Sequence, residues 1–209
     1  HHGAKSQVAI PTNTATGCTK SMSGSLTVTV NPLPVAQTLT GGGNYCIGGT
    51  GVPVGLANST TGVDYQLYRG IVAIGSPVSG TTGSAISFGN QTVTGTYTVK
   101  ATNTTTGCMN NMTGSGVVTT SPLPAVFTVT GGGNYCSGGT GVAVNLNGSV
   151  VGTNYQLYLG GATIGSPMAG TGGILNFGPQ TAAGTYTIAA LTTASTCANN
   201  MAGSANVTV

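Results

Sequence analysis

The tetrapeptide Tyr65-Gln66-Leu67-Tyr68 recurs as Tyr155-Gln156-Leu157-Tyr158, at an offset of 90 residues (155 − 65). Apolar and polar side chains alternate through both copies, which is the pattern of a β-strand with one buried face. The stretch Gly-Gly-Gly-Asn-Tyr-Cys at 41–46 recurs at 131–136 with the same offset (136 − 46). Similarity at a fixed offset indicates an array of small domains of one kind.

This offset divides the chain into one repeat at 31–120 and a second at 121–209. Residues 1–30 match the end of a repeat, because Thr16-Gly17-Cys18 corresponds to Thr106-Gly107-Cys108. We therefore predict that 1–30 form the C-terminal hairpin of a truncated preceding repeat. The two full repeats are each predicted to form one domain.

Short alternating apolar runs separated by Gly, Asn and Thr predict about seven strands in each repeat. Turn residues recur at roughly ten-residue spacing, which is typical of an Ig-like sandwich. The Gly-rich segment 41–51 is interpreted as a long connection that holds Cys46. The predicted fold is all-β, with tandem antiparallel Ig-like β-sandwiches arranged as a rod. The strands expected in the first repeat are 35–40, 52–56, 63–67, 71–74, 84–88, 96–102 and 117–120.

Proline-rich joints precede both full repeats. Asn31-Pro32-Leu33-Pro34 precedes the first, and Ser121-Pro122-Leu123-Pro124 precedes the second. Two prolines in four residues favour a stiff, extended polyproline conformation. The joints therefore predict that neighbouring domains keep a nearly fixed relation.

The scarcity of charge argues against catalysis. Only 2% of residues are charged, and Asp64 is the only carboxylate side chain, so chemistry that needs two carboxylates is excluded. The histidines, His1 and His2, lie at the chain start, where no Ser-His-Asp arrangement is credible. We expect no enzyme activity, no cofactor and no metal. There is neither a basic stripe for nucleic acid nor an apolar run of membrane-spanning length.

The cysteines predict disulfides and an oxidising, extracellular setting. Each full repeat has an early and a late cysteine: Cys46 with Cys108, and Cys136 with Cys197. Pairing within repeats would give Cys46–Cys108 and Cys136–Cys197, although alternating strands place these two positions at opposite poles of a sandwich. Stacked domains would instead permit the inter-domain pair Cys46–Cys197. The sequence leaves both alternatives open, and Cys18 lacks a partner in either.

Tyrosines fall into two classes by their place in the alternation. Tyr65 and Tyr97 share a face with apolar neighbours and are predicted to lie in the core. Tyr68 and its equivalent Tyr158 fall on the opposite face, where an exposed ring could stack on a sugar. They are the candidate contact residues for a surface glycan.

The order Tyr-Cys-x-Gly-Gly, Tyr-Gln-x-Tyr, Gly-Thr-Tyr-Thr-Val, Thr-Gly-Cys, Val-Thr-Val and Pro-Leu-Pro resembles Ig-like repeats of very large secreted proteins from Bacteroidetes-type bacteria. That resemblance covers essentially the whole chain. It implies surface adhesins, some linked to gliding and exported by the type IX pathway. It implies no catalytic residue.

We expect a non-catalytic structural or adhesive segment of a long extracellular repeat protein at the cell surface, acting as a stiff stalk or filament. Its partners would be further repeats of the same chain or other copies in a filament. One alternative is a binding module whose repeats grip a glycan or a neighbouring chain. Ice binding through Thr-rich strands such as 26–30 is a remote alternative, because the Thr pattern is not kept at 117–120.

Overall fold

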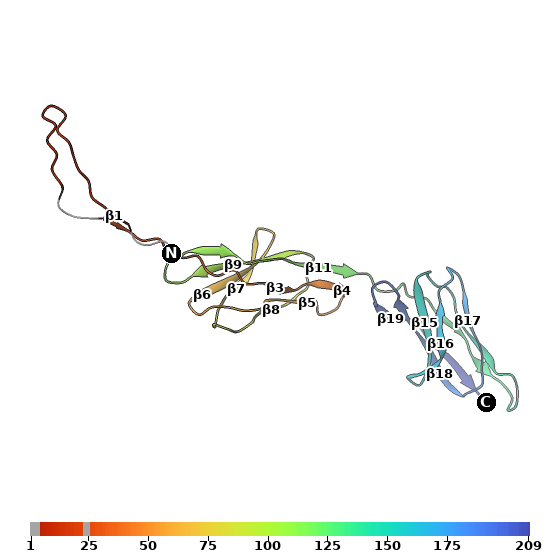
Figure 1. Cartoon of the computed structure of the whole chain (residues 1–209). Helices are drawn as coiled ribbons and strands as arrows, with labels where there is room; N and C mark the ends of the chain where they lie inside the picture. The colour runs from red at the N-terminus through yellow and green to blue at the C-terminus, as the bar shows by residue number, and fades with distance from the viewer. Residues whose placement is uncertain (1–4, 23–25) are drawn as a thin grey trace. The chain divides into compact units, whose positions relative to one another are not determined.

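A computed structural model describes residues 5–22 and 26–209, so His1 and His2 lie outside the described residues (Figure 1). Every regular element in these ranges is a β-strand, which confirms the predicted all-β class. The chain forms two compact units. One comprises residues up to 40, 55–88 and 97–115, and the other comprises 41–54, 89–96 and 116–209. The domain boundaries at 31 and 121 stay a prediction.

Two sheets are formed by the first sequence repeat. The smaller has the order β3-β5-β8, and the larger has the order β4-β11-β9-β6-β7 with β10 on the edge of β9. The long strand β7 therefore extends the larger sheet and does not join the smaller one. The strands are β3 (Leu39–Gly41), β4 (Gly43–Cys46), β5 (Val52–Leu56), β6 (Val63–Arg69), β7 (Val72–Ser79), β8 (Ile86–Gln91), β9 (Gly95–Asn103), β10 (Met109–Asn111) and β11 (Gly116–Ser121).

The second sequence repeat has the same two sheets. Their orders are β12-β14-β17 and β13-β20-β18-β15-β16, with β19 on the edge of β18. Recurrence of the strand order confirms that the repeats in sequence are repeats in fold. The strands are β12 (Val129–Gly131), β13 (Gly133–Asn134), β14 (Val142–Leu146), β15 (Thr153–Leu159), β16 (Ala162–Ala169), β17 (Leu175–Gln180), β18 (Gly184–Thr192), β19 (Ala198–Asn200) and β20 (Ala205–Thr208).

An apolar cluster of buried side chains joins the two sheets of the second repeat. Val144 and Leu146 come from the smaller sheet, while Tyr155 and Ile188 come from the larger one. Two sheets that bury facing side chains in one cluster form a β-sandwich. In the first repeat, Tyr65 and Tyr97 are at most 1% exposed, which confirms their predicted place in the core.

A bulge between β6 and β7 explains the recurring glutamine in Tyr-Gln-Leu-Tyr. The register of the two strands shifts between Tyr65 and Leu67. Gln66 Nε2 donates to the carbonyl oxygens of Leu67 and Ile74, both at 2.9 Å. Gln156 makes the same pair of hydrogen bonds in the second repeat, both at 2.8 Å. The side-chain amide thus links carbonyl oxygens of both strands where the register shifts.

Residues 41–51 are not simply a connection, contrary to the sequence interpretation. The chain leaves the smaller sheet at β3 and joins the larger sheet as β4, which runs parallel to β11. Gly41, Gly42 and Gly43 make this switch with φ values of 89°, 85° and 139°. A Cβ on Gly41 would lie 2.0 Å from the carbonyl oxygen of Pro53. The close approach of two backbones explains why glycine is required there.

The proline joints are anchored in the same way in both repeats. Asn110 Nδ2 donates to the carbonyl oxygen of Pro34 at 2.8 Å, and Asn199 Nδ2 donates to that of Pro124 at 3.0 Å. The first joint is therefore bound to β10 and the second to β19, each about 75 residues later in the sequence. Stiffness of the joints and a rod-like arrangement stay predictions.

Replacing Gly41 by alanine is expected to lower the free energy of unfolding by about 2 kcal/mol or more. The new Cβ would clash with the Pro53 carbonyl oxygen. The alanine would also have to adopt the positive φ of this position, which is unfavourable for an L-residue. Gly62→Ala is the matched control, because its φ is 80° but nothing lies within 4 Å of the added Cβ. Urea denaturation would measure both. Equal losses in the two variants would contradict the close-approach argument.

Candidate functional site

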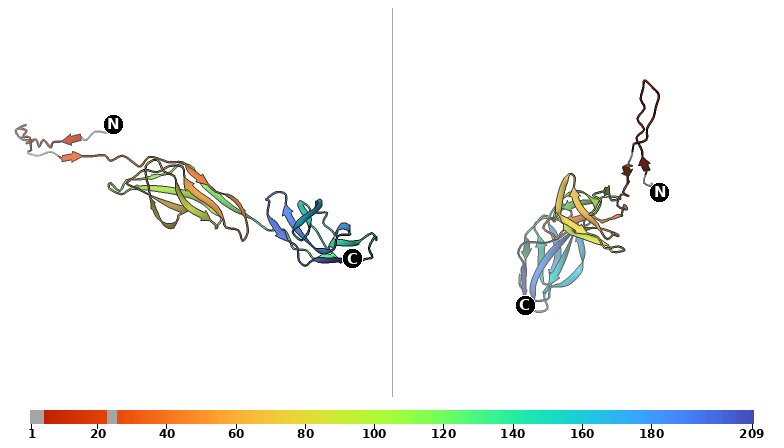
Figure 2. Two further views of the ribbon diagram at one scale, coloured as in Figure 1. Left: turned by 90° about the horizontal axis from the view of Figure 1, so that it is seen from below. Right: turned by 90° about the vertical axis from the view of Figure 1, so that its left-hand side faces the viewer.

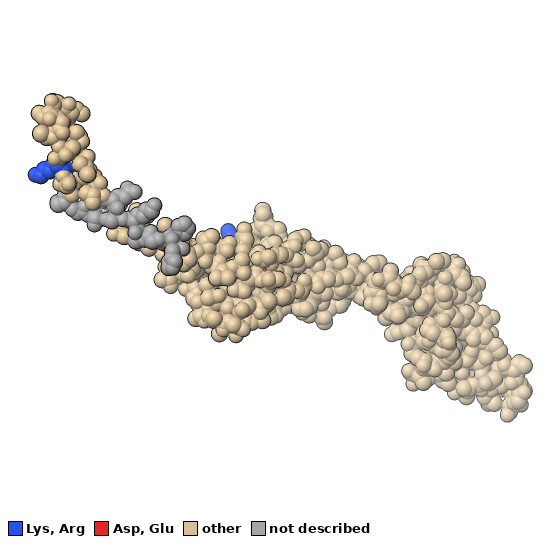
Figure 3. Space-filling model, in the orientation of Figure 1, with Lys and Arg blue, Asp and Glu red and all other residues tan. Residues whose placement is uncertain are grey.

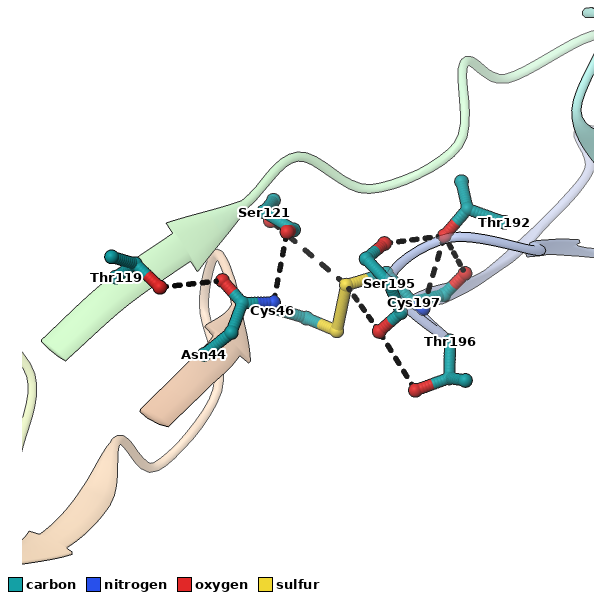
Figure 4. Close-up of a disulfide and its surroundings, with 8 residues drawn as sticks. All are labelled: Asn44, Cys46, Thr119, Ser121, Thr192, Ser195, Thr196 and Cys197. Carbon is teal, nitrogen blue, oxygen red and sulfur yellow. Dashed lines mark hydrogen bonds between the residues drawn. A yellow bond between two sulfur atoms is a disulfide. The ribbon is translucent and has the colours of Figure 1, made fainter. Parts of the chain in front are cut away.

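A disulfide joins Cys46 to Cys197 (Figure 4). The S–S distance is 2.06 Å and the Cα atoms are 5.6 Å apart, within the usual range for a bridge. Cys18, Cys108 and Cys136 have free thiols. Of the two pairings that the sequence left open, the structure contains the one that links the first sequence repeat to the second.

Pairing within a repeat is prevented by the length of one strand. Cys136 follows β13, which lies near the start of β18, because both β13 and the start of β18 pair with the end of β20. Cys197 precedes β19, which pairs with the end of β18 at Leu191. The nine residues of β18 extend over about 30 Å. Bridged Cα atoms lie within about 7 Å, so Cys136–Cys197 does not form, and the same topology separates Cys46 from Cys108.

Parallel pairing with β11 fixes the position of Cys46. Cys46 lies opposite Ser121, and Ile47 N–H donates to the Ser121 carbonyl at 3.0 Å. Asn44 Nδ2 donates to Ser121 Oγ at 2.9 Å, and Thr119 Oγ1 donates to Asn44 Oδ1 at 3.1 Å. These contacts hold the end of β4 against the last residue of β11.

Cys197 is held by a tight turn after β18. Its N–H donates to Thr192 Oγ1 at 3.1 Å, and its carbonyl accepts from Thr192 N–H at 2.9 Å. The Sγ of Cys197 lies 4.0 Å from the Ser121 carbonyl oxygen, a van der Waals contact because a disulfide sulfur carries no proton. Ser121 therefore touches both halves of the bridge.

The residue before Cys197 has an unusual backbone. Thr196 has a φ of 55°, the only positive value at a residue other than glycine in the described ranges. In the first repeat the equivalent position is Gly107, with a φ of 70°. A β-branched residue in this region is strained, whereas glycine is not.

Tyr68 and Tyr158 are half-buried, so they are less exposed than the sequence suggested. Each lines a shallow groove on the outer face of its larger sheet. The groove at Tyr68 has a volume of about 290 Å³ and is also lined by Thr98, Lys100 and Asn111. The groove at Tyr158 has a volume of about 300 Å³ and a more apolar lining. The two rings thus hold equivalent places but face different side chains.

The remaining chemistry is sparse. No group of three or more His, Cys, Asp or Glu side chains that could hold a metal occurs among residues 5–22 and 26–209. Asp64 accepts a hydrogen bond from Ser79 Oγ at 2.6 Å across the β6–β7 hairpin. Burial raises the pKa of Tyr186, whose hydroxyl donates to the Ala182 carbonyl at 2.9 Å. Figure 3 shows how little of the visible surface carries Lys, Arg, Asp or Glu.

The part of the chain that the structure describes contains no helix long and apolar enough to cross a membrane.

No family model and no curated protein matches this sequence. Solved structures do match. The human OSCAR ligand-binding domain is 14% identical with a TM-score of 0.35, and the match covers 84% of this chain and 100% of that one. The FN1–FN3 domains of chicken CNTN1 are 13% identical with a TM-score of 0.42, over 97% of this chain and 76% of that one. Murine CEACAM1b is 12% identical with a TM-score of 0.39, over 85% and 96% respectively. The strand order and the core between the two sheets define the fold of each repeat.

Exchanging the residues before the two late cysteines should change stability in opposite directions. Thr196→Gly is expected to raise the free energy of unfolding by about 1 kcal/mol, because it relieves a positive φ. Gly107→Thr is expected to lower it by a similar amount at the equivalent turn. Guanidinium denaturation under non-reducing conditions would measure both. Destabilisation by Thr196→Gly would contradict the assignment of strain.

Proposed function

We propose that this chain is a non-catalytic structural and adhesive segment of a long extracellular repeat protein, acting as a stiff stalk or surface filament. The observation that carries the proposal is the Cys46–Cys197 disulfide, which joins successive sequence repeats by a covalent bond besides the main chain. Enzymes need acids, bases or nucleophiles held in a fixed geometry. Here the recurring features are turns, core residues and cysteines.

The chemistry of this bond supports an extracellular location. Disulfides form and persist in oxidising compartments and are rare where thiols are kept reduced. The repeat motifs resemble those of secreted bacterial surface adhesins, which supports a place at the cell surface. Further repeats of the same chain, or other copies in a filament, are the proposed partners.

The mechanism is resistance to extension. The disulfide closes a loop with a sequence separation of 151 residues. When the ends of the chain are pulled apart, residues inside this loop are shielded from the force even after the strands separate. Under force, the two repeats would therefore extend by only a short distance until the disulfide is reduced.

Force spectroscopy on the whole chain tests this mechanism. Reduction of the disulfide is expected to increase the fully unfolded contour length by about 500 Å, because 151 residues at about 3.5 Å each become free to extend. Cys46→Ser should give the longer length without reductant. Cys108→Ser is the matched control and should behave like the original chain. Equal lengths before and after reduction would contradict the proposal.

A second candidate function is glycan binding at the outer face of the larger sheets. It is favoured by one observation, which is that Tyr68 and Tyr158 line grooves at equivalent positions of the two repeats. A half-buried ring in a shallow groove presents an apolar surface beside polar groups, which suits a sugar ring.

Glycan-array binding would test this candidate with paired variants. Replacing both Tyr68 and Tyr158 by alanine should weaken any binding several-fold, since the ring surface is lost. Replacing both by phenylalanine keeps the ring and should retain most of the binding. The candidate fails if no glycan binds the original chain, or if the alanine variant binds equally well.

A further inference from the structure

The surroundings of the free Cys108 thiol repeat those of the bonded Cys197. Cys108 Sγ lies 3.9 Å from the carbonyl oxygen of Asn31, and Cys197 Sγ lies 4.0 Å from that of Ser121. Asn31 and Ser121 are equivalent positions (121 − 31 = 90). The carbonyl of each cysteine also accepts a backbone N–H at 2.9 Å from the residue five positions earlier. Cys108 therefore makes the same two carbonyl contacts as the bonded Cys197.

The strand that leads to Asn31 has the register of a closing strand. β1 (Lys5–Gln7) pairs with β2 (Leu26–Val28), and Figure 2 shows the two side by side. Lys5 lies opposite Val28 just as Gly184 lies opposite Val207, and both differences are 179 residues (184 − 5 and 207 − 28). Residues 5–7 and 26–28 thus pair in the register of the corresponding strands at the end of the second repeat.

This hairpin exposes side chains whose equivalents are buried. Met22 is 56% exposed, whereas its equivalent Met112 is 6% exposed. Val28 is 52% exposed, whereas Val118 is 1% exposed. In the described residues, the hairpin therefore lacks the opposing surface that covers these positions in the full repeats.

We propose that residues 28–31, together with Cys108, form the acceptor site for a Gly-Asn-Tyr-Cys strand of a further repeat of this kind. The strand would pair in parallel with residues 28–31, as β4 pairs with β11, where Gly43 lies opposite Val118 and Cys46 lies opposite Ser121. Its cysteine would then lie opposite Asn31 and form a disulfide with Cys108. This inference deepens the proposed function by naming the partner at one joint, and it rests on that function.

The bond forms by thiol–disulfide exchange with a low-molecular-weight disulfide such as oxidised glutathione. The incoming cysteine thiolate attacks the oxidised glutathione, forms a mixed disulfide and releases one glutathione thiolate. Cys108 thiolate then attacks the cysteine sulfur of that mixed disulfide and releases the second glutathione. Two protein thiols are oxidised, and one small disulfide is reduced to two thiols.

The test uses the whole chain and the peptide Gly-Gly-Gly-Asn-Tyr-Cys, supplied as its mixed disulfide with glutathione. A peptide of the same composition in scrambled order, with the cysteine still last, is the control. Mass spectrometry of a trypsin and chymotrypsin digest would measure the rate of peptide attachment to each of Cys18, Cys108 and Cys136, while the Cys46–Cys197 bond is checked to remain intact.

Strand pairing predicts that Cys108 reacts about tenfold faster with the native peptide than with the scrambled one. Cys18 and Cys136 should not distinguish the two peptides. If exposure alone set the rate of peptide attachment, Cys18 and Cys136 would react faster than Cys108, because they are exposed and Cys108 is half-buried. The proposal is overturned if Cys108 reacts equally with both peptides, or if Cys18 and Cys136 show the same preference. Force spectroscopy of the Cys46–Cys197 loop does not depend on this result.

Discussion

The close approach of the backbone at Gly41 to the backbone at Pro53 is the constraint on which the rest of the arrangement depends. Only a residue without a Cβ fits there, because a Cβ on Gly41 would lie 2.0 Å from the Pro53 carbonyl oxygen. In the second repeat, a Cβ on Gly131 would lie 2.1 Å from the Ala143 carbonyl oxygen. At this point the chain leaves the smaller sheet and joins the larger one in parallel with the closing strand. The switch brings Cys46 to the end of β11.

A covalent link between repeats follows from that placement. Cys46 lies opposite the last residue of β11, where the proline joint begins, and the turn that holds Cys197 contacts the same Ser121. The bond therefore forms at the joint and not inside a sandwich. Charges differ between the two repeats, while glycines, cysteines and core residues recur.

Much of the fold could be predicted from alternation alone. The Tyr65 and Tyr97 strands bury the faces that their patterns indicated. β4 was missed because a strand that begins with glycine has no alternating apolar side chains. Its partner strand β11 also lies 75 positions away in the sequence (118 − 43). The bulge amide of Gln66 and the positive φ of Thr196 were missed too. The pattern identifies Gln66 only as a polar residue in a strand. The positive φ of Thr196 could have been suspected only from its equivalent Gly107, since glycine often marks a turn of this kind.

Disulfide mapping under non-reducing conditions tests the central claim most directly. Trypsin alone is insufficient, because Lys100 is the last basic residue and leaves Cys108, Cys136 and Cys197 on one peptide. A second digestion with chymotrypsin, which cuts after aromatic residues, separates the three cysteines. Our account predicts a peptide containing Cys46 linked to one containing Cys197. A link from Cys46 to Cys108 would contradict it.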